Sequence, residues 1–431
     1  MKFENTLKFA RKMDAQDPLR TYRAEFHIPV AHGKRSIYFT GNSLGAQPKS
    51  VKTIILEELD DWAKLGVEGH VHARRPWLYY HRFAKKSLAK VVGGKQNEVI
   101  AMNQLTVNLH LLLASFYRPT RERFKIIVEA GAFSSDQYAL ETQLKWHNID
   151  PASALIEIQP RNGEHSLRTS DILQVIKQHA SQVALVLFGG VQYYTGQFFE
   201  IEPITAAAHD VGAFAGFDLA HAVGNVPLSL HKHNVDFAVW CSYKYLNSGP
   251  GSIAGAFVHE KHGNAFTLPR LGGWWGHDET ERFEMKKGFK PMPGIDGWQV
   301  SNIPVLQAAA HLAALEIFDR AGILSIRKKS ILLTGYLEYL LHEIDPNGKY
   351  FTVITPSGAS ERGCQLSLLF QRDGRRIASA LEKHGVLTDW REPNVIRAAP
   401  VPLYNSFEDV FKFGNILANE VKSMALKSKR S

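Results

Sequence analysis

The sequence predicts an α/β protein in which helices cover both faces of a mostly parallel central sheet, followed by a smaller α+β domain. Three observations lead to this fold class. The chain has 431 residues and 45% of them are hydrophobic, which is enough to bury a large core and to form more than one domain. Short apolar runs alternate with helical stretches through the middle of the chain. After Gly294 this alternation gives way to a long helical region.

The expected elements follow from the spacing of apolar residues. Residues 47–93 read as helices, because Val51, Ile54, Ile55, Leu59 and Trp62 recur at helical spacing. Continuous apolar runs interleaved with helices are typical of a parallel sheet that is buried on both faces. Six such runs predict strands at 99–102, 125–128, 154–158, 182–187, 213–217 and 236–240.

The C-terminal part has a different pattern. A helical region is expected at 304–344, with a junction between two helices near Gly322. Strands at 365–370 and 395–399 and helices at 375–384 and 406–424 would complete an α+β unit.

Composition and charge exclude several classes of function. The net charge is +9, but the basic residues are scattered and accompany no nucleic-acid recognition motif, so we expect no nucleic-acid partner. No apolar span is long enough for a membrane helix, and the N-terminus matches neither a secretory signal nor a transit peptide. The two cysteines, Cys241 and Cys364, indicate no disulfide framework. These features favour a cytoplasmic protein.

Motifs for metals and nucleotides are absent from the sequence. The nineteen histidines show no metal-ligand spacing, and HEKH at 259–262 lacks the spacing of the HExxH motif, so no metal is expected. Neither GxGxxG nor GxxxxGK[ST] is present. Cys241 ends an apolar strand, and we interpret it as a packed small residue rather than a nucleophile.

The most informative stretch is 216–255, which places Asp218 just after one buried strand and Lys244 just after the next. In open α/β sheets, ligands bind at the carboxyl ends of the strands, so both side chains should enter one crevice. A lysine there can form a Schiff base with a cofactor, and a carboxylate can keep a pyridine nitrogen protonated. Taken singly, each residue is more often a helix cap or a solvated lysine. The glycine-rich segment after Lys244 favours a ligand site.

Two loops would complete such a site. Residues 103–106 follow a strand and begin an apolar helix, where free N–H groups, the helix dipole and the Thr106 hydroxyl suit a phosphate. In 129–137, Phe133 could stack on a ring, with Ser134, Ser135 and Asp136 beside it. The alternative is that Thr106 and the serines only cap their helices.

Motifs along most of the chain resemble the kynureninase family, a member of the fold-type I pyridoxal-phosphate enzymes related to the aspartate aminotransferases. They include YFTGNSLG at 38–45, MNQLTVNLHLL at 102–112, EAGAFSSDQYA at 129–139, GFDLAHAVGN at 216–225, WCSYKYLN at 240–247 and IRAAPVPLYNSF at 396–407. Single pieces occur in related enzymes, but the ordered set is specific. The resemblance implies an N-terminal segment at 1–46 that packs with the small domain, a large cofactor-binding domain at 47–300 and a small domain at 301–431.

The resemblance also implies roles for individual residues. Lys244 would hold pyridoxal 5'-phosphate as the internal aldimine, and Tyr243 and Asp218 would be catalytic. The cofactor would be contacted by Leu105, Thr106, Phe133, Ser134, Ser135, Asp136, Asp218, His221, Tyr243, Trp274 and Asn302. The substrate would be contacted by Ser43, His70 and Asn302 at its aromatic end and by Arg397 at its carboxylate. A guanidinium can bind a carboxylate through two hydrogen bonds.

Gly189 departs from the family pattern, because much of the family has a small hydroxyl residue there. The family alignment also leaves Trp275 as an alternative to Trp274. The implied activity is the hydrolysis of L-kynurenine, or 3-hydroxykynurenine, to anthranilate, or 3-hydroxyanthranilate, and L-alanine by a homodimer, in tryptophan catabolism or NAD biosynthesis. Tyr243 is either an acid/base or a phosphate ligand. The alternatives are a cysteine desulfurase or class V aminotransferase of the same fold, and a non-catalytic basic binding protein.

Overall fold

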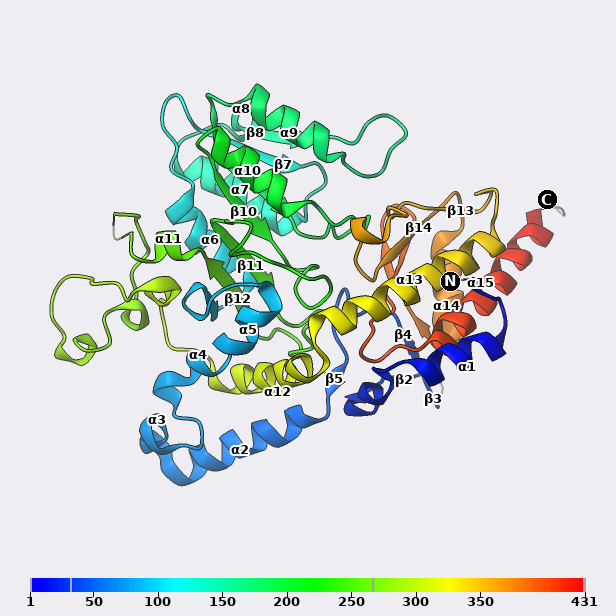
Figure 1. Cartoon of the computed structure of the whole chain (residues 1–431), viewed down its shortest axis with the longest axis horizontal. Coiled ribbons are helices and arrows are strands. Elements are labelled where there is room, and N and C mark those ends of the chain that lie inside the picture. Colours follow the sequence, from blue (N-terminus) through cyan, green and yellow to red (C-terminus); the bar gives the residue numbers. More distant parts are fainter. Residues whose placement is uncertain (1, 32, 266, 429–431) are drawn as a thin grey trace.

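The computed structural model describes residues 2–31, 33–265 and 267–428 (Figure 1). Within these residues, a mixed seven-stranded sheet has the order β6-β12-β11-β10-β9-β7-β8. Its strands are β6 Val99–Ala101, β7 Lys125–Glu129, β8 Leu155–Ile158, β9 Val183–Gly189, β10 Phe214–Asp218, β11 Phe237–Cys241 and β12 Ala254–Val258. The six predicted strands are confirmed as β6 to β11, and all run parallel because only β12 is antiparallel to its neighbours β6 and β11.

Strand β12 is the element of this sheet that the apolar runs did not predict. It is rich in small residues, Ala254, Gly255 and Ala256, which carry a weak strand signal. The small residues are needed because a Cβ on Gly255 would lie 2.1 Å from the Trp240 ring on the neighbouring strand. Packing against Trp240 therefore requires small residues, and because small residues have low strand propensity, the sequence pattern does not predict this strand.

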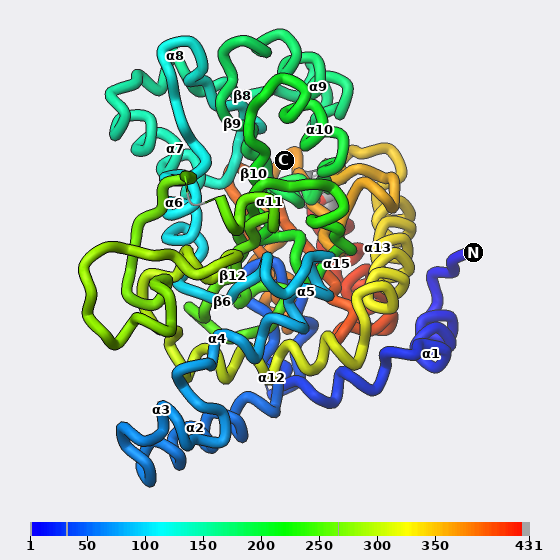
Figure 2. The backbone as a smooth tube through the Cα atoms, turned by 60° about the vertical axis from the view of Figure 1, so that its left-hand side comes forward, coloured from blue at the N-terminus to red at the C-terminus, as the bar shows by residue number. Residues whose placement is uncertain are grey.

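Helices cover both faces of the sheet, as Figures 1 and 2 show. Along β9, Leu185 and Leu187 pack in one core with α6 and α7. Val186 and Phe188 pack in another core with α9, α10 and α12, because successive side chains of a strand point to opposite faces.

The helices that the structure describes are α1 Leu7–Gln16, α2 Ser50–Leu65, α3 Gly69–His72, α4 Tyr80–Phe83, α5 Lys85–Val92, α6 Leu105–Phe116, α7 Ser134–Trp146, α8 Pro151–Ala154, α9 Thr169–Gln178, α10 Ile201–Asp210, α11 Glu260–Gly263, α12 Val305–Ala321, α13 Ile323–Ile344, α14 Gly374–Lys383 and α15 Phe407–Ser428.

A second, antiparallel sheet with the order β13-β14-β17-β16 forms the smaller lobe on the right of Figure 1. Its strands are β13 Phe351–Val353, β14 Leu366–Phe370, β16 Asp389–Arg391 and β17 Val395–Ala398. The remaining short strands are β1 Phe26–His27, β2 Val30–Ala31, β3 Lys34–Arg35, β4 Ile37–Tyr38, β5 Gln47–Pro48 and β15 Val386–Leu387. The helical region expected at 304–344 is confirmed as α12 and α13, which meet at Gly322.

The hydrophobic cores show which segments pack together. Phe9, Ala10 and Met13 of α1 share the core of the small sheet with α13, α14 and α15, and β4 pairs with β15. Helix α12 packs instead in the core of the large sheet. The division of the chain at residues 46 and 300 stays a prediction, and this packing favours a boundary after α12. Among the helices that the structure describes, none has both the length and the apolar character that a lipid bilayer requires.

Candidate active site

The carboxyl ends of neighbouring strands bring the predicted residues together. Asp218 is the last residue of β10, and Lys244 follows β11 by three residues. Because parallel strands end at one edge of the sheet, both side chains enter the same pocket. Nine predicted residues line it: Leu105, Thr106, Phe133, Ser135, Asp136, Asp218, His221, Tyr243 and Lys244. Ser134 is the exposed first residue of α7 and does not line this pocket.

Lys244 lies at the centre of the pocket. Its Nζ is 2.8 Å from His221 Nε2 and 5.7 Å from the centre of the Phe133 ring. Burial and then the charge of Lys244 hold the pKa of His221 well below its usual range, so this imidazole is neutral and can accept a hydrogen bond from the amine. His221 Nδ1 has no hydrogen-bond partner among the described residues. The only lysine among the residues that line this pocket is therefore held over an aromatic face.

Two buried acids lie beside Lys244. Asp218 accepts a hydrogen bond from the Ala220 N–H at 2.7 Å. Burial raises the pKa of Asp218, although the Ala220 N–H, Asp136 and Lys244 oppose the rise. Burial and the negative charge of Asp218 raise the pKa of Asp136 well above its usual range, so Asp136 is the acid that keeps its proton. Asp136 Oδ1 has no partner among the described residues, and a protonated ring nitrogen is a group that this pair can bind.

Two helix N-termini meet at one end of the pocket. Helix α6 begins at Leu105 and α7 begins at Ser134, both without a side-chain cap, so their first N–H groups are available to a ligand. The hydroxyls of Thr106 and Ser135 lie 2.7 Å apart and join the two ends. Free N–H groups, two helix dipoles and two hydroxyls fit the phosphate of pyridoxal phosphate.

Sequence reasoning missed Glu129, which also lines the pocket. It is the last residue of β7, and both of its carboxylate oxygens accept a hydrogen bond from the Gly189 N–H, at 3.1 and 3.2 Å. Burial raises the pKa of Glu129 to about 8. A Cβ on residue 189 would lie 2.9 Å from Glu129 Oε1. The Glu129 carboxyl therefore fills the space where a hydroxyl residue at 189 would place its side chain. Glu129 lies at the end of a buried strand, which is the same signal that predicted Asp218, so the sequence could have revealed Glu129 as well.

Arg397 lies on the small domain, outside the lining of the pocket, but reaches toward it. Its side chain is 1% exposed. Arg397 Nη1 donates to the Tyr193 carbonyl at 2.6 Å, and Tyr193 itself lines the pocket beside Phe133. Burial lowers the pKa of Arg397, and an ion pair with Asp389 opposes this shift. Arg397 is therefore a buried cation between the two domains, and not the surface residue that its sequence context alone would suggest.

Besides Ser134 and Arg397, four predicted residues are not part of the pocket: Ser43, His70, Trp274 and Asn302. Trp274 is 50% exposed, and Ser43 and Asn302 are exposed as well. His70 is half-buried beside Trp77, and its Nδ1 has no partner among the described residues. The pocket of a single chain therefore lacks them.

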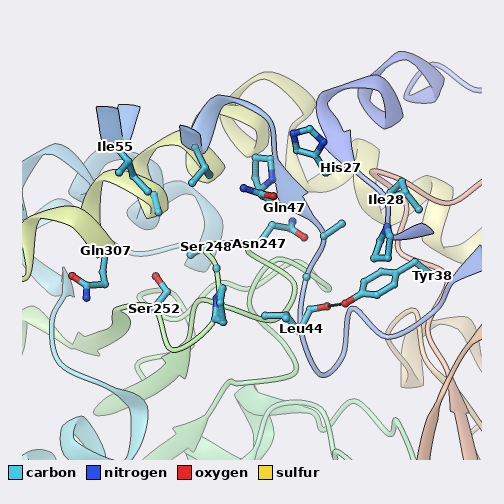
Figure 3. A pocket seen from close by; sticks show the side chains of 18 of the residues that line it. His27, Ile28, Tyr38, Leu44, Gln47, Ile55, Asn247, Ser248, Ser252 and Gln307 are labelled. Carbon is cyan, nitrogen blue, oxygen red and sulfur yellow. Dashed lines mark hydrogen bonds between the residues drawn. The ribbon is translucent and has the colours of Figure 1, made fainter. Parts of the chain in front are cut away.

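A larger cavity, of about 700 Å³, lies next to this pocket without containing Lys244 or Asp218 (Figure 3). Segment 44–48 forms one wall, and Asn247 and Ser252, from the loop after Lys244, also line the cavity. The Gly45 N–H donates to the Tyr243 carbonyl at 2.8 Å, which fixes segment 44–48 against the Lys244 loop. The cavity is mostly apolar and holds none of the charged groups that the chemistry requires.

Tyr243, the two cysteines and Glu98 are other groups that could react or bind a metal. Burial raises the pKa of the Tyr243 phenol above its usual range, so this hydroxyl keeps its proton. Cys241 and Cys364 are both free and buried. Glu98 lies close to His231 and His259, but its carboxylate already accepts hydrogen bonds from the N–H groups of Lys95 and Glu260 and from His231. Its lone pairs are therefore engaged in holding two helix starts.

Comparisons with known proteins identify the family of the chain. The family model described as the kynureninase C-terminal domain matches residues 326–417. The chain is 54% identical to the kynureninase of Flavobacterium psychrophilum over 97% of this chain and 98% of that protein. It is 53% identical to the kynureninase of Myxococcus xanthus, again over 97% and 98% of the two chains.

Solved structures show the same fold at much lower identity. The apo cysteine desulfurase of Thermococcus onnurineus NA1 has a TM-score of 0.75 at 19% identity and covers 98% of this chain and 100% of that one. A C-DES variant with glycine covalently linked to the PLP cofactor has a TM-score of 0.74 at 16% identity, over 89% and 96% of the two chains. The fold is therefore that of the type I pyridoxal-phosphate enzymes, as the sequence predicted, and the chain belongs to the kynureninase family of pyridoxal-phosphate-dependent hydrolases.

Proposed function

We propose that this enzyme hydrolyses the Cβ–Cγ bond of L-kynurenine to give anthranilate and L-alanine, and that it also accepts 3-hydroxykynurenine. The observation that carries the proposal is the placement of Lys244 between Phe133 and His221, beside the buried acids Asp218 and Asp136. The kynureninase relatives at 54% and 53% identity support the choice of substrate. The activity would serve tryptophan catabolism or NAD biosynthesis.

The pocket has a residue for each part of the cofactor. When bound, pyridoxal phosphate supplies an aldehyde that bonds covalently to amines and a ring that withdraws electrons from the substrate Cα. Lys244 would hold the aldehyde carbon, and Asp218, with Asp136, would keep the ring nitrogen protonated. The hydroxyls of Thr106 and Ser135, with the N–H groups at the starts of α6 and α7, would hold the phosphate.

The chain's own residues also provide for the substrate. Arg397 would bind the α-carboxylate, since its Nε is a buried donor without a partner among the described residues. Lys244 Nζ would move a proton at the substrate Cα, and its contact with the neutral His221 ring supports this role because it fixes the position of the amine. The protonated Tyr243 phenol would hold or donate a proton at the ketone oxygen.

A homodimer would supply the residues that the pocket lacks. Large apolar side chains are exposed on α2 and in segment 267–293: Trp62 is 62%, Phe283 is 64% and Met285 is 79% exposed. Both segments extend from the large domain in Figures 1 and 2. Exposed apolar patches of this kind mark protein interfaces. We propose that a second copy covers them and brings Trp274, Asn302, His70 and Ser43 to the phosphate and the aromatic end of the substrate.

The rival activity on this fold, cysteine desulfuration, requires a reactive cysteine. Burial raises the pKa of Cys241 and raises that of Cys364 to about 12, so neither thiol is available as a thiolate at neutral pH. The two buried reduced thiols are also compatible with a cytoplasmic enzyme, which is the location that we propose.

The proposal is tested by replacing Lys244 with Ala and, as a matched control, the exposed Lys90 with Ala. The parent and K90A should trap pyridoxal phosphate on reduction with borohydride and should release anthranilate from L-kynurenine. K244A should trap none, and its turnover should fall by about a thousandfold or more, because the amine that attaches the cofactor and moves the proton is lost. Anthranilate release by K244A at the parental rate would refute the assignment of Lys244. Sulfide release from L-cysteine, without anthranilate from L-kynurenine, would refute the proposed substrate.

A further inference from the structure

The register of the small sheet places three charged residues on one face. Strands β16 and β17 are antiparallel, with Asp389 opposite Arg397 and Arg391 opposite Val395. Because side chains alternate along a strand and paired residues share a face, Asp389, Arg391 and Arg397 project to the same side. Trp390, which lies between the two, packs in the core of the small domain instead. The charged face is the one that meets the large domain at Tyr193.

The contacts show that Asp389 lies between two guanidinium groups. Arg397 Nη2 donates to Asp389 Oδ2, and Arg391 Nε lies 3.4 Å from Asp389 Oδ1. The Asp389 side chain is 11% exposed, and the Arg397 guanidinium is fixed from two sides, by Asp389 and by the Tyr193 carbonyl. An arginine that is held at two of its nitrogens presents its remaining N–H groups in one direction.

The charges of this group do not cancel. Two guanidinium groups and one carboxylate leave one net positive charge, and this charge lies on Arg391, whose side chain is 39% exposed but whose Nε is buried without a hydrogen-bond partner among the described residues. Glu392 does not neutralise it, because its side chain is 69% exposed and pairs with Arg375. His221, the titratable group of the pocket nearest Lys244, is neutral, so it adds no charge. A buried N–H donor without a partner is unfavourable, so the Arg391 Nε can accept an anion as its hydrogen-bond partner.

An anion at this position can belong to a ligand that also reaches Lys244. The positive charges of Lys244, Arg397 and Arg391 all disfavour the charged form of His221, so the three cations act on one pocket. His221 Nε2 is 2.8 Å from Lys244 Nζ. An α-amino acid carries its carboxylate and its amine on one carbon, and it therefore matches a site with Lys244 at one end and the arginines at the other.

We propose that Asp389 and Arg391 complete the receptor for the α-carboxylate of the substrate: Asp389 is a positioning residue that orients the Arg397 guanidinium, and Arg391 supplies the positive charge that a carboxylate neutralises. The proposal rests on the proposed function, in which Arg397 binds this carboxylate. It extends the carboxylate site from one residue to three.

The test measures equilibrium binding to the holoenzyme by the change in cofactor absorbance. The two ligands are L-alanine and ethylamine, which is alanine without its carboxylate. Arg391→Gln should raise the dissociation constant of L-alanine about tenfold and leave that of ethylamine unchanged, because a charge-assisted contact is lost. Arg391→Lys should restore most of the affinity. Arg375→Gln removes a guanidinium from α14 that is 78% exposed and should change neither constant.

Asp389 is tested in the same assay. Asp389→Ala should weaken alanine binding about tenfold, although it makes the site more positive, because Arg397 loses one of its two anchors. Asp389→Asn, which keeps an acceptor oxygen, should lie between Asp389→Ala and the parent, and it serves as the second variant if Asp389→Ala does not fold. Tighter alanine binding by either variant would show that Asp389 competes with the ligand, which overturns its positioning role.

The outcomes separate this inference from the proposed function. If Arg397→Gln abolishes alanine binding but Arg391→Gln does not alter it, the three-residue receptor is refuted and the role of Arg397 stands. If Arg397→Gln itself leaves alanine binding unchanged, the proposed carboxylate ligand is wrong. An equal loss for ethylamine in Arg391→Gln would show that Arg391 acts on the fold or on the cofactor, which also refutes the inference.

Discussion

Eight residues that the sequence predicts meet around Lys244 within one chain, whereas Trp274 and Asn302 lie outside that pocket on exposed surface. The first group sits at the carboxyl ends of the strands β10 and β11 and at the N-termini of α6 and α7, so the fold of the chain positions it. Trp274 belongs to segment 267–293, which extends away from the body of the large domain in Figure 2, and Asn302 lies just before α12. The difference teaches that resemblance to a family can assign residues to one site although a single chain does not bring them together.

The largest effect is expected from an experiment that mixes subunits, which tests whether Asn302 acts in the site of a second copy. Lys244→Ala and Asn302→Asp, each inactive as a pure protein, should regain activity when unfolded and refolded together. If Asn302 acts in the partner's site, mixed dimers have one intact site, and roughly one quarter of the parental activity should return. The measurement is anthranilate release against the mixing ratio.

The control for this experiment pairs two defects from the same pocket. Mixing Lys244→Ala with Asp218→Asn should return no activity, because each site of a mixed dimer then carries one defect. If mixed Asn302→Asp dimers form and remain inactive, Asn302 does not act across the interface.

A smaller effect is expected from the buried acid Glu129. Its pKa is raised from 4.5 to about 8, so the folded protein holds a proton that the unfolded chain loses above pH 4.5. Stability should therefore fall as pH rises from about 5 to above 8, and Glu129→Gln should remove this loss. We expect Glu129→Gln of the cofactor-free protein to be no more stable than the parent at pH 4.5 and more stable at pH 8.5, by a few kcal/mol at most. Urea unfolding at the two pH values measures this, and an equal change at both would contradict the raised pKa.

The smallest effect concerns Gly189. Gly189→Ala should destabilise the protein by about 1 kcal/mol, because its Cβ would lie 2.9 Å from Glu129 Oε1 and would displace that carboxyl. In a Glu129→Ala background the same change should be nearly neutral, since the competing atom is gone. If the changes in the free energy of unfolding add in the double variant, the side chains at 129 and 189 do not compete for the same space.

Much of the fold could be predicted because the parallel strands are continuous apolar runs and the helices are periodic. Strand β12 could not, since contact with Trp240 selects small residues there. Asp218, Lys244 and Thr106 were predictable because each lies at or just after the carboxyl end of a strand, where ligands bind in open α/β sheets. Glu129 has the same signal and was overlooked. Asp389 and Arg391 gave no signal, because their role depends on strand pairing with β17 across a loop.

The segment between β4 and β5 has a mechanical consequence. Residues 37 and 38 pair with β15, and Thr40 pairs with Ala399, both in the small domain that carries Arg397. Only a few residues later, Gly45 is fixed to the Tyr243 carbonyl, and its Cα has no room for a side chain because a Cβ would lie 2.3 Å from the Lys244 carbonyl oxygen. The small domain therefore cannot rotate as a rigid body without pulling on the backbone of Lys244. This short connection therefore limits how far the Lys244 amine and the Arg397 guanidinium can move apart.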